Sequence, residues 1–172
     1  MKKKRIAAAA ASVMIITILT ACGETAKESK AKEPEASDQG AITFLTPEVK
    51  DGTIDIDTSL LSDKEPLYIN YDANGTMVQM IAVKASDGTD RVSLNTCQSC
   101  NPSPKAFFQA ENGLLVCQNC GNRFRFDAVG SEAGGCNPMP IAYEAGEGTL
   151  RVKADELEQY ADRFTSWGGR TE

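Results

Sequence analysis

Two pairs of cysteines constrain this chain more than any other feature of its sequence. Cys97 and Cys100 form one C-x2-C pair, Cys117 and Cys120 form a second, and sixteen residues separate the pairs. Two such pairs at this separation are a strong signal for a metal site. Each C-x2-C turn directs two thiolates at one ion, and two turns supply four soft ligands in a tetrahedron. The spacing therefore predicts a four-cysteine metal centre.

Two other uses of these cysteines stay open. An exported chain can close disulfides, but five cysteines remain after Cys22, and the fifth, Cys136, would have no partner. A thioredoxin-type dithiol needs a helix directly after its pair, and neither Asn101-Pro102 nor Gly121 begins a helix. Asn and Gly are instead the residue types that most readily adopt left-handed backbone, which we expect at the end of each turn.

Histidine is absent from the 172 residues. Its absence excludes Ser-His-Asp and Cys-His catalysis, mixed Cys/His zinc sites, His-ligated haem and the iron site made of two His and one carboxylate. No nucleophile lies beside a base, and Asp87, Asp90 and Asp127 have the pattern of turn and strand-end residues. We therefore predict no catalytic residue, and at most a redox carrier.

The N-terminal segment has the pattern of a bacterial lipoprotein leader. Four basic residues, 2–5, precede an apolar run, 6–19, that is too short to span a bilayer comfortably. The run ends in Leu-Thr-Ala-Cys, which predicts a signal peptide over 1–21 and lipidation of Cys22. Residues 22–40 lack large apolar side chains and predict a flexible tether, which leaves 41–172 as a Cys-rich metal-binding domain. We expect a lipid-anchored protein on the extracytoplasmic face of the cell membrane.

The charge of the chain argues against nucleic acid as a partner. The net charge is −6, and the predicted leader holds four of the 18 basic residues. A chain without a basic cluster in its body cannot neutralise a phosphate backbone, so nucleic-acid binding is not expected.

The body of the chain reads as a mainly β domain. Alternating apolar residues over 67–71 and 77–83 flank Asn74-Gly75, and a second hairpin over 106–109 and 114–116 flanks Asn112-Gly113. Further strands are predicted over 91–95, leading into the first cysteine pair, and over 123–126. One helix is expected near the end, because Leu157, Tyr160, Ala161 and Phe164 share a face of a helix. The prediction is a small antiparallel β core with a C-terminal helix.

Three motifs in order resemble those of the FtrD-like family of membrane-associated iron-sulfur proteins. They are Asn-Thr-Cys-Gln-Ser-Cys at 95–100, Val-Cys-Gln-Asn-Cys-Gly-Asn-Arg-Phe at 116–124 and Gly-Gly-Cys-Asn-Pro-Met-Pro at 134–140. The likeness extends over about residues 67–167. The layout is also distantly similar to a Rieske domain, so the metal hairpins are expected to be Rieske-like or zinc-ribbon-like. The chain departs from the Rieske pattern because cysteines replace both histidines, which favours a lower reduction potential.

Two candidates remain for the metal, an iron-sulfur cluster and zinc. The resemblance implies an iron-sulfur cluster on Cys97, Cys100, Cys117 and Cys120, with electron transfer or iron acquisition beside a permease or another redox partner. Spacing alone equally suits structural zinc, in a lipoprotein that serves a transporter as an accessory or binding module. The leader also lacks the twin-arginine pattern of proteins that are exported with a cofactor already loaded. Cys136 is expected near the centre without being one of its four ligands.

Overall fold

The computed structural model describes residues 42–131 and 134–172. The predicted signal peptide, Cys22 and the tether up to residue 40 lie outside the described residues. The strands are β1 (Thr43–Leu45), β2 (Thr53–Asp57), β3 (Leu67–Ala73), β4 (Thr76–Lys84), β5 (Asp90–Cys97), β6 (Phe108–Glu111), β7 (Leu114–Cys117), β8 (Arg123–Phe124), β9 (Pro138–Pro140), β10 (Glu144–Gly146) and β11 (Thr149–Lys153). The helical elements are α1 (Ala154–Glu158) and three 3-10 turns, η1 (Thr58–Leu60), η2 (Phe126–Ala128) and η3 (Ala161–Phe164). The predicted mainly β fold with a C-terminal helix is confirmed.

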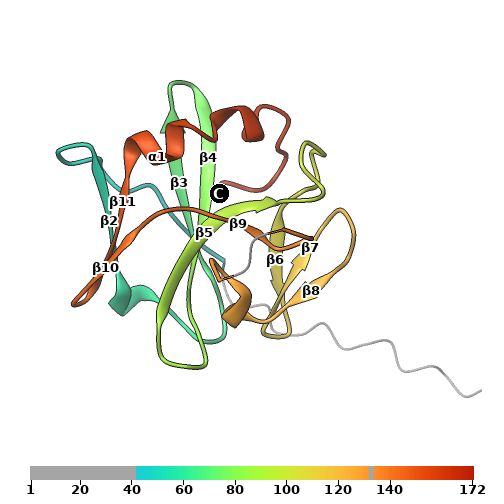
Figure 1. Cartoon of the computed structure of the whole chain (residues 1–172), viewed down its shortest axis with the longest axis horizontal. Coiled ribbons are helices and arrows are strands. Elements are labelled where there is room, and N and C mark those ends of the chain that lie inside the picture. The colour runs from blue at the N-terminus through green and yellow to red at the C-terminus, as the bar shows by residue number, and fades with distance from the viewer. Residues whose placement is uncertain (1–41, 132–133) are drawn as a thin grey trace, which may run out of the picture. The chain divides into compact units, whose positions relative to one another are not determined.

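The described strands form three sheets. The central sheet has the order β1-β3-β4-β5-β9, and the two smaller sheets have the orders β10-β11-β2 and β6-β7-β8. Figure 1 shows the two small sheets on opposite sides of the central strands. All pairings are antiparallel except that of β1 with β3, which is parallel. Both predicted hairpins are present, with Asn74 and Asn112 at positive φ in their turns.

The central sheet is buried on both faces because successive side chains of its strands point into two different apolar clusters. In β4, Val78, Met80 and Ala82 face the larger cluster, which contains residues of β2 and β11 and of the C-terminal helical turns. Ile81 and Val83 face the smaller cluster with the β6-β7-β8 sheet. Successive side chains of a strand point to opposite faces, so one strand contributes to both cores.

Cys97 belongs to the second of these faces. It ends β5 and lies in the smaller cluster with Phe108, Leu115 and Cys117. The first C-x2-C pair therefore begins on the central sheet, and the second begins at the end of β7 in the small sheet that packs against it.

A row of buried amides crosses this same face of the central sheet. Gln79 Nε2 donates to Asn70 Oδ1 at 2.7 Å, and Asn95 Nδ2 donates to Gln79 Oε1 at 2.7 Å. Asn95 Oδ1 accepts from the backbone N–H of Phe108 at 2.7 Å, which links β5 to β6. The C-terminal residues cover the other end of the row, because Gln79 and Asn70 donate to the carbonyl oxygens of residues 170 and 171.

Two local predictions are wrong in detail. The strand predicted over 123–126 ends at Phe124, and Phe126 begins the turn η2. Asp127 lies in this turn, where its carboxylate accepts from the N–H of Ser86 at 2.7 Å and so connects η2 to the β4–β5 turn. Asp127 is thus a turn residue, as predicted.

The C-terminal helix is also shorter than its periodicity suggests. The α-helix α1 ends at Glu158, and Tyr160, with φ −104° and ψ 3°, separates it from η3. Leu157 and Phe164 are still buried against the larger cluster, with Tyr160 and Ala161 partly buried beside them. The predicted face exists, but it is divided between two short pieces, α1 and η3.

Candidate metal centre

The first cysteine loop follows directly from β5. The backbone N–H of Asn101 donates to the carbonyl of Cys97 at 3.0 Å, and this bond closes the turn. The backbone N–H groups of Cys100 and Ser99 point at the Cys97 sulfur. Asn101 is not among the described residues with positive φ, contrary to the prediction. Its side chain instead donates to Thr96 Oγ1 at 3.0 Å and to the carbonyl of Arg163 at 2.6 Å, which binds the loop to η3.

The second loop repeats this geometry at the end of β7. The N–H of Gly121 donates to the carbonyl of Cys117 at 2.8 Å, and the N–H groups of Cys120 and Asn119 point at the Cys117 sulfur. Gly121 has a φ of 74°, as predicted for the end of the turn. Ser103 Oγ of the first loop donates to Asn119 Oδ1 at 2.7 Å, so the two loops also contact each other.

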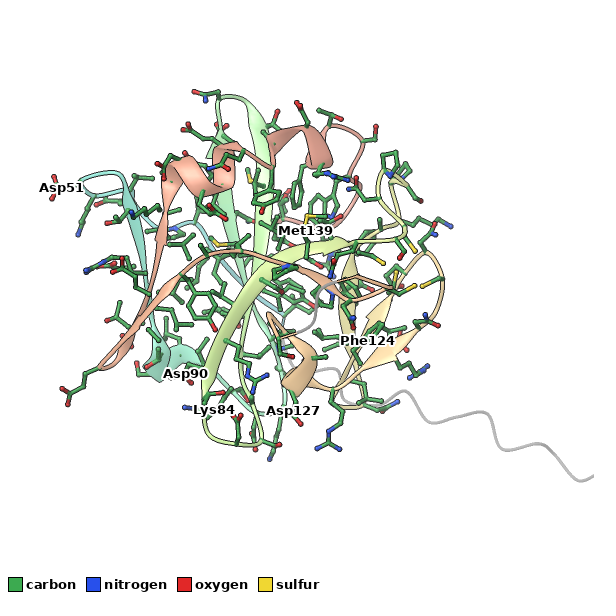
Figure 2. The ribbon with its side chains drawn as sticks, in the orientation of Figure 1. Asp51, Lys84, Asp90, Phe124, Asp127 and Met139 are labelled. Atoms are coloured by element: carbon green, nitrogen blue, oxygen red, sulfur yellow. The ribbon has the colours of Figure 1, made fainter. Side chains whose placement is uncertain are left out.

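The two loops and the segment before β9 bring five sulfur atoms together. The Sγ atoms of Cys97, Cys100 and Cys117 all lie within 4.8 Å of one another, and so do those of Cys100, Cys120 and Cys136. Figure 2 shows yellow sulfur atoms gathered beside the β6-β7-β8 sheet, whereas the labelled Lys84, Asp90 and Asp127 lie toward the lower end of the view. All five thiols are free, so the described residues form no disulfide.

The cluster has a buried end and an exposed end. Cys97 and Cys117 have no exposed surface, Cys100 and Cys136 are half-buried, and Cys120 is exposed. Any group held by these thiols would therefore meet solvent on the side of Cys120.

The thiols at the buried end and at the exposed end also differ in pKa. Burial raises the pKa of Cys97, and burial raises the pKa of Cys117 to about 11 despite the N–H groups directed at each sulfur. The pKa of Cys120 is lowered. Its slight burial alone would raise this pKa, but hydrogen bonds from the N–H of Asn122 and from neighbouring thiols outweigh the effect of burial. Buried thiols that bind a cation must first lose their protons, so metal binding here would release protons.

The chemistry of the donor set fits a thiolate-bound metal or cluster. Residues 97–104, 117–122 and 134–138 contain no charged side chain, so the negative charge of bound thiolates would be balanced by the cation and by backbone N–H groups. The Sγ atoms of Cys100 and Cys117 are 3.8 Å apart. A tetrahedral ion with metal–sulfur bonds of about 2.3 Å needs sulfurs about 3.8 Å apart. Two cysteines on one metal ion satisfy this requirement.

The sequence matches the model of one protein family. The match covers residues 61–164, more than half of the chain, and the family is described as membrane iron-sulfur containing protein FtrD-like. The chain belongs to the FtrD-like family. This membership and the cysteine cluster together support a metal protein with a metal cofactor. In the part of this FtrD-like chain that the structure describes, no helix is long and apolar enough to cross a membrane.

The comparisons with curated proteins and with solved structures say less about this chain than the family match does. No curated protein matches the chain. Among solved structures, the quaternary ammonium Rieske monooxygenase CntA with an inhibitor is similar at 19% identity and a TM-score of 0.36, over 62% of this chain and 34% of that one. The same enzyme with L-carnitine is similar at 17% identity and a TM-score of 0.35, over 62% and 35%. The FtrD-like chain spans about a third of the length of these monooxygenases.

Sequence reasoning selected the cysteines but not the residues that hold their loops in place. Gln98, Ser99 and Asn101 connect the first loop to distant segments, and Asn122 donates its N–H toward Cys120. The only signal for them was their position inside or directly after the C-x2-C motifs. Polar residues there are common in any turn, so the signal does not identify their partners.

Proposed function

We propose that this protein is an extracytoplasmic, lipid-anchored iron-sulfur protein that transfers electrons, with Cys97, Cys100, Cys117 and Cys120 as the cluster ligands. The observation that supports this most directly is the pair of matching loops, each with two N–H groups directed at the sulfur of its first cysteine. Such N–H groups stabilise a thiolate and tune the potential of a cluster bound to it. When bound, an iron-sulfur cluster accepts and donates single electrons.

The residues of this chain would insulate one side of the cluster and open the other. Cys97 and Cys117 hold the inner side in a cluster with Phe108 and Leu115, which excludes water. Cys120 lies at the surface, where a partner protein can approach. The rim of uncharged loops suits a partner that docks by shape rather than by charge.

The partner that we propose is a redox protein or permease of the same membrane, in a system that acquires iron. The resemblance to FtrD-like proteins supports this assignment, and so does the predicted lipid anchor at Cys22. Replacing Cys22 with Ala should move the protein out of the membrane fraction or leave its leader uncleaved. If the variant fractionates and is processed like the parent, the proposed anchor is wrong.

Structural zinc is the second candidate, because the 3.8 Å separation of Cys100 and Cys117 Sγ suits one tetrahedral ion. In that case the protein would be a binding module that serves a transporter. Protein purified without oxygen distinguishes the two functions. A brown protein with iron and acid-labile sulfide supports the electron carrier, and a colourless protein with zinc and no sulfide supports the binding module. Cys97→Ala should lose most of either metal, because no other described thiol replaces it at the buried end.

A further inference from the structure

The segment before β9 adds a fifth thiol at the exposed end of the centre. Cys136 Sγ lies within 4.8 Å of both Cys100 and Cys120 Sγ. Cys100 therefore belongs to two groups of three, one with the buried Cys97 and Cys117 and one with the exposed Cys120 and the half-buried Cys136. The exposed end has one more thiol than a four-cysteine centre requires.

Hydrogen bonds to the first cysteine loop hold Cys136 in this position. Gly134 N–H donates to Gln98 Oε1 at 2.6 Å, Ser99 Oγ donates to Gly135 O at 2.5 Å, Cys97 Sγ donates to Cys136 O at 3.3 Å, Gln98 N–H donates to Asn137 O at 3.1 Å and Gln98 Nε2 donates to Pro138 O at 3.1 Å. These bonds join residues 97–99 to every residue of 134–138. The bond from Cys97 Sγ requires the protonated thiol, so the other four hold the segment when Cys97 is a metal-bound thiolate. The segment is therefore part of the site rather than a neighbouring surface loop.

Close packing against β5 restricts the backbone at Gly130, shortly before this segment. At Gly130, which has a φ of 66°, a Cβ atom would lie 2.9 Å from the carbonyl oxygen of Val92 in β5. At the other end, β9 pairs with β5, where Pro138 is opposite Cys97. The same strand that ends in Cys97 thus positions the segment that contains Cys136.

We propose that Cys136 is an exchangeable ligand of the centre, so that the exposed end is held by Cys100 together with either Cys120 or Cys136. This inference rests on the proposed metal site but not on the kind of metal. In the exchange, one metal–sulfur bond breaks as another forms, and a proton moves from the incoming thiol to the departing thiolate. No electron is gained or lost.

The two ligand states differ in the hydrogen bonds to the bound sulfur. The backbone N–H of Asn122 points at Cys120 Sγ, whereas the side chain of Asn122 faces Cys136. Hydrogen bonds to a ligand sulfur tune the reduction potential of a bound centre. Exchange at the exposed end would therefore give the centre two potentials, while Cys97 and Cys117 stay bound.

Alanine variants test the exchange, because alanine cannot ligate. Cys120→Ala and Cys136→Ala, each reconstituted without oxygen with iron and sulfide, should retain metal within about twofold of the parent. The double variant Cys120→Ala/Cys136→Ala should lose about tenfold, and so should the control Cys117→Ala. The visible and electron paramagnetic resonance spectra of Cys120→Ala should shift, because a different sulfur then binds the metal. Circular dichroism checks that each variant is folded.

Two results would overturn the inference while leaving the proposed function intact. One is an empty centre in Cys120→Ala together with parent-like metal content and spectra in Cys136→Ala. The other is a double variant that holds as much metal as Cys120→Ala. If the parent takes up zinc and no iron or sulfide, the electron carrier fails and zinc content in the same variants decides the exchange. If the parent binds no metal, both proposals fail.

Alkylation of the loaded parent gives a second measurement that needs no variant. With iodoacetamide under native conditions, exchange predicts one label per molecule, divided between Cys120 and Cys136 in the peptide masses. A label confined to Cys136 would show that Cys120 is a permanent ligand and would contradict the exchange.

Discussion

The five clustered thiols differ in their surroundings although their side chains are identical. Cys97 and Cys117 are fully buried where strands β5 and β7 end, and Cys120 is exposed after one further turn of chain. In each pair, the first cysteine belongs to the core and the second lies toward solvent. A C-x2-C turn has this effect whenever its first residue is the inward-facing end of a strand.

Thiol reactivity should follow this gradient in metal-free protein. Iodoacetamide should label Cys120 first and Cys97 and Cys117 on the order of tenfold more slowly, because only an accessible thiolate reacts. Peptide mass spectrometry over time measures the rates. In urea the five rates should converge, and a Cys97 rate equal to that of Cys120 in native protein would contradict the described burial.

At the scale of elements, β5 connects the two apolar clusters. One of its faces contributes Val92 and Leu94 to the larger cluster, and the other contributes Asn95 and Cys97 toward the small sheet of the metal loops. Trp167 also donates from Nε1 to the carbonyl of Asn95 at 2.8 Å, which joins the C-terminal segment to the same strand. The amide of Asn95 is therefore a link between the core and the metal loops.

Replacing Asn95 with Ala should destabilise the protein by about 2–6 kcal/mol. The change leaves the Phe108 N–H and Gln79 Oε1 without their partner inside the fold, and each buried unsatisfied group costs about 1–3 kcal/mol. Urea unfolding measures the difference. The exposed Glu147→Ala should lie within about 0.5 kcal/mol of the parent, and an equally small effect at Asn95 would show that water replaces the lost bonds.

At the scale of the whole described domain, two separate apolar clusters stabilise the fold, and only one of them includes cysteines. The larger cluster lies between the central sheet, β2, β11 and the C-terminal turns, and contains none of the cysteines. The smaller cluster includes Cys97 and Cys117, with Cys100 and Cys136 packed against it. Metal binding should therefore stabilise one side of the domain more than the other.

Metal removal should loosen the β6-β7-β8 sheet while the central sheet stays folded. We expect amide hydrogen exchange over 106–126 to accelerate about tenfold after chelation, which corresponds to ~1.4 kcal/mol of local stability. Exchange over β3 and β4 should change by less than about twofold. Complete unfolding on chelation would instead show that the larger cluster cannot support the fold alone.

Most of what could be predicted rests on sequence patterns among residues that are close together in the chain. The two Asn-Gly turns and the alternation in β3, β4 and β5 depend on neighbouring residues, and these predictions hold in the structure. The four-cysteine ligand set expected from the C-x2-C pairs stays a prediction. The strand predicted through Phe126 and the continuous C-terminal helix were wrong. In the first case Asp127 of the turn η2 is bonded to a distant residue, Ser86, and in the second Tyr160, with φ −104° and ψ 3°, separates α1 from η3.

The sequence by itself determined which residues can bind a metal, because only the C-x2-C spacing places soft ligands in pairs and no histidine competes. Tertiary structure decided how the pairs meet and which of their thiols Cys136, expected near the centre from the sequence, approaches. Cys136 reaches Cys100 and Cys120 because β9 pairs with β5 and because residues 97–99 bind residues 134–138. Contacts between segments so far apart depend on strand pairing and packing across the whole domain, which no local pattern encodes.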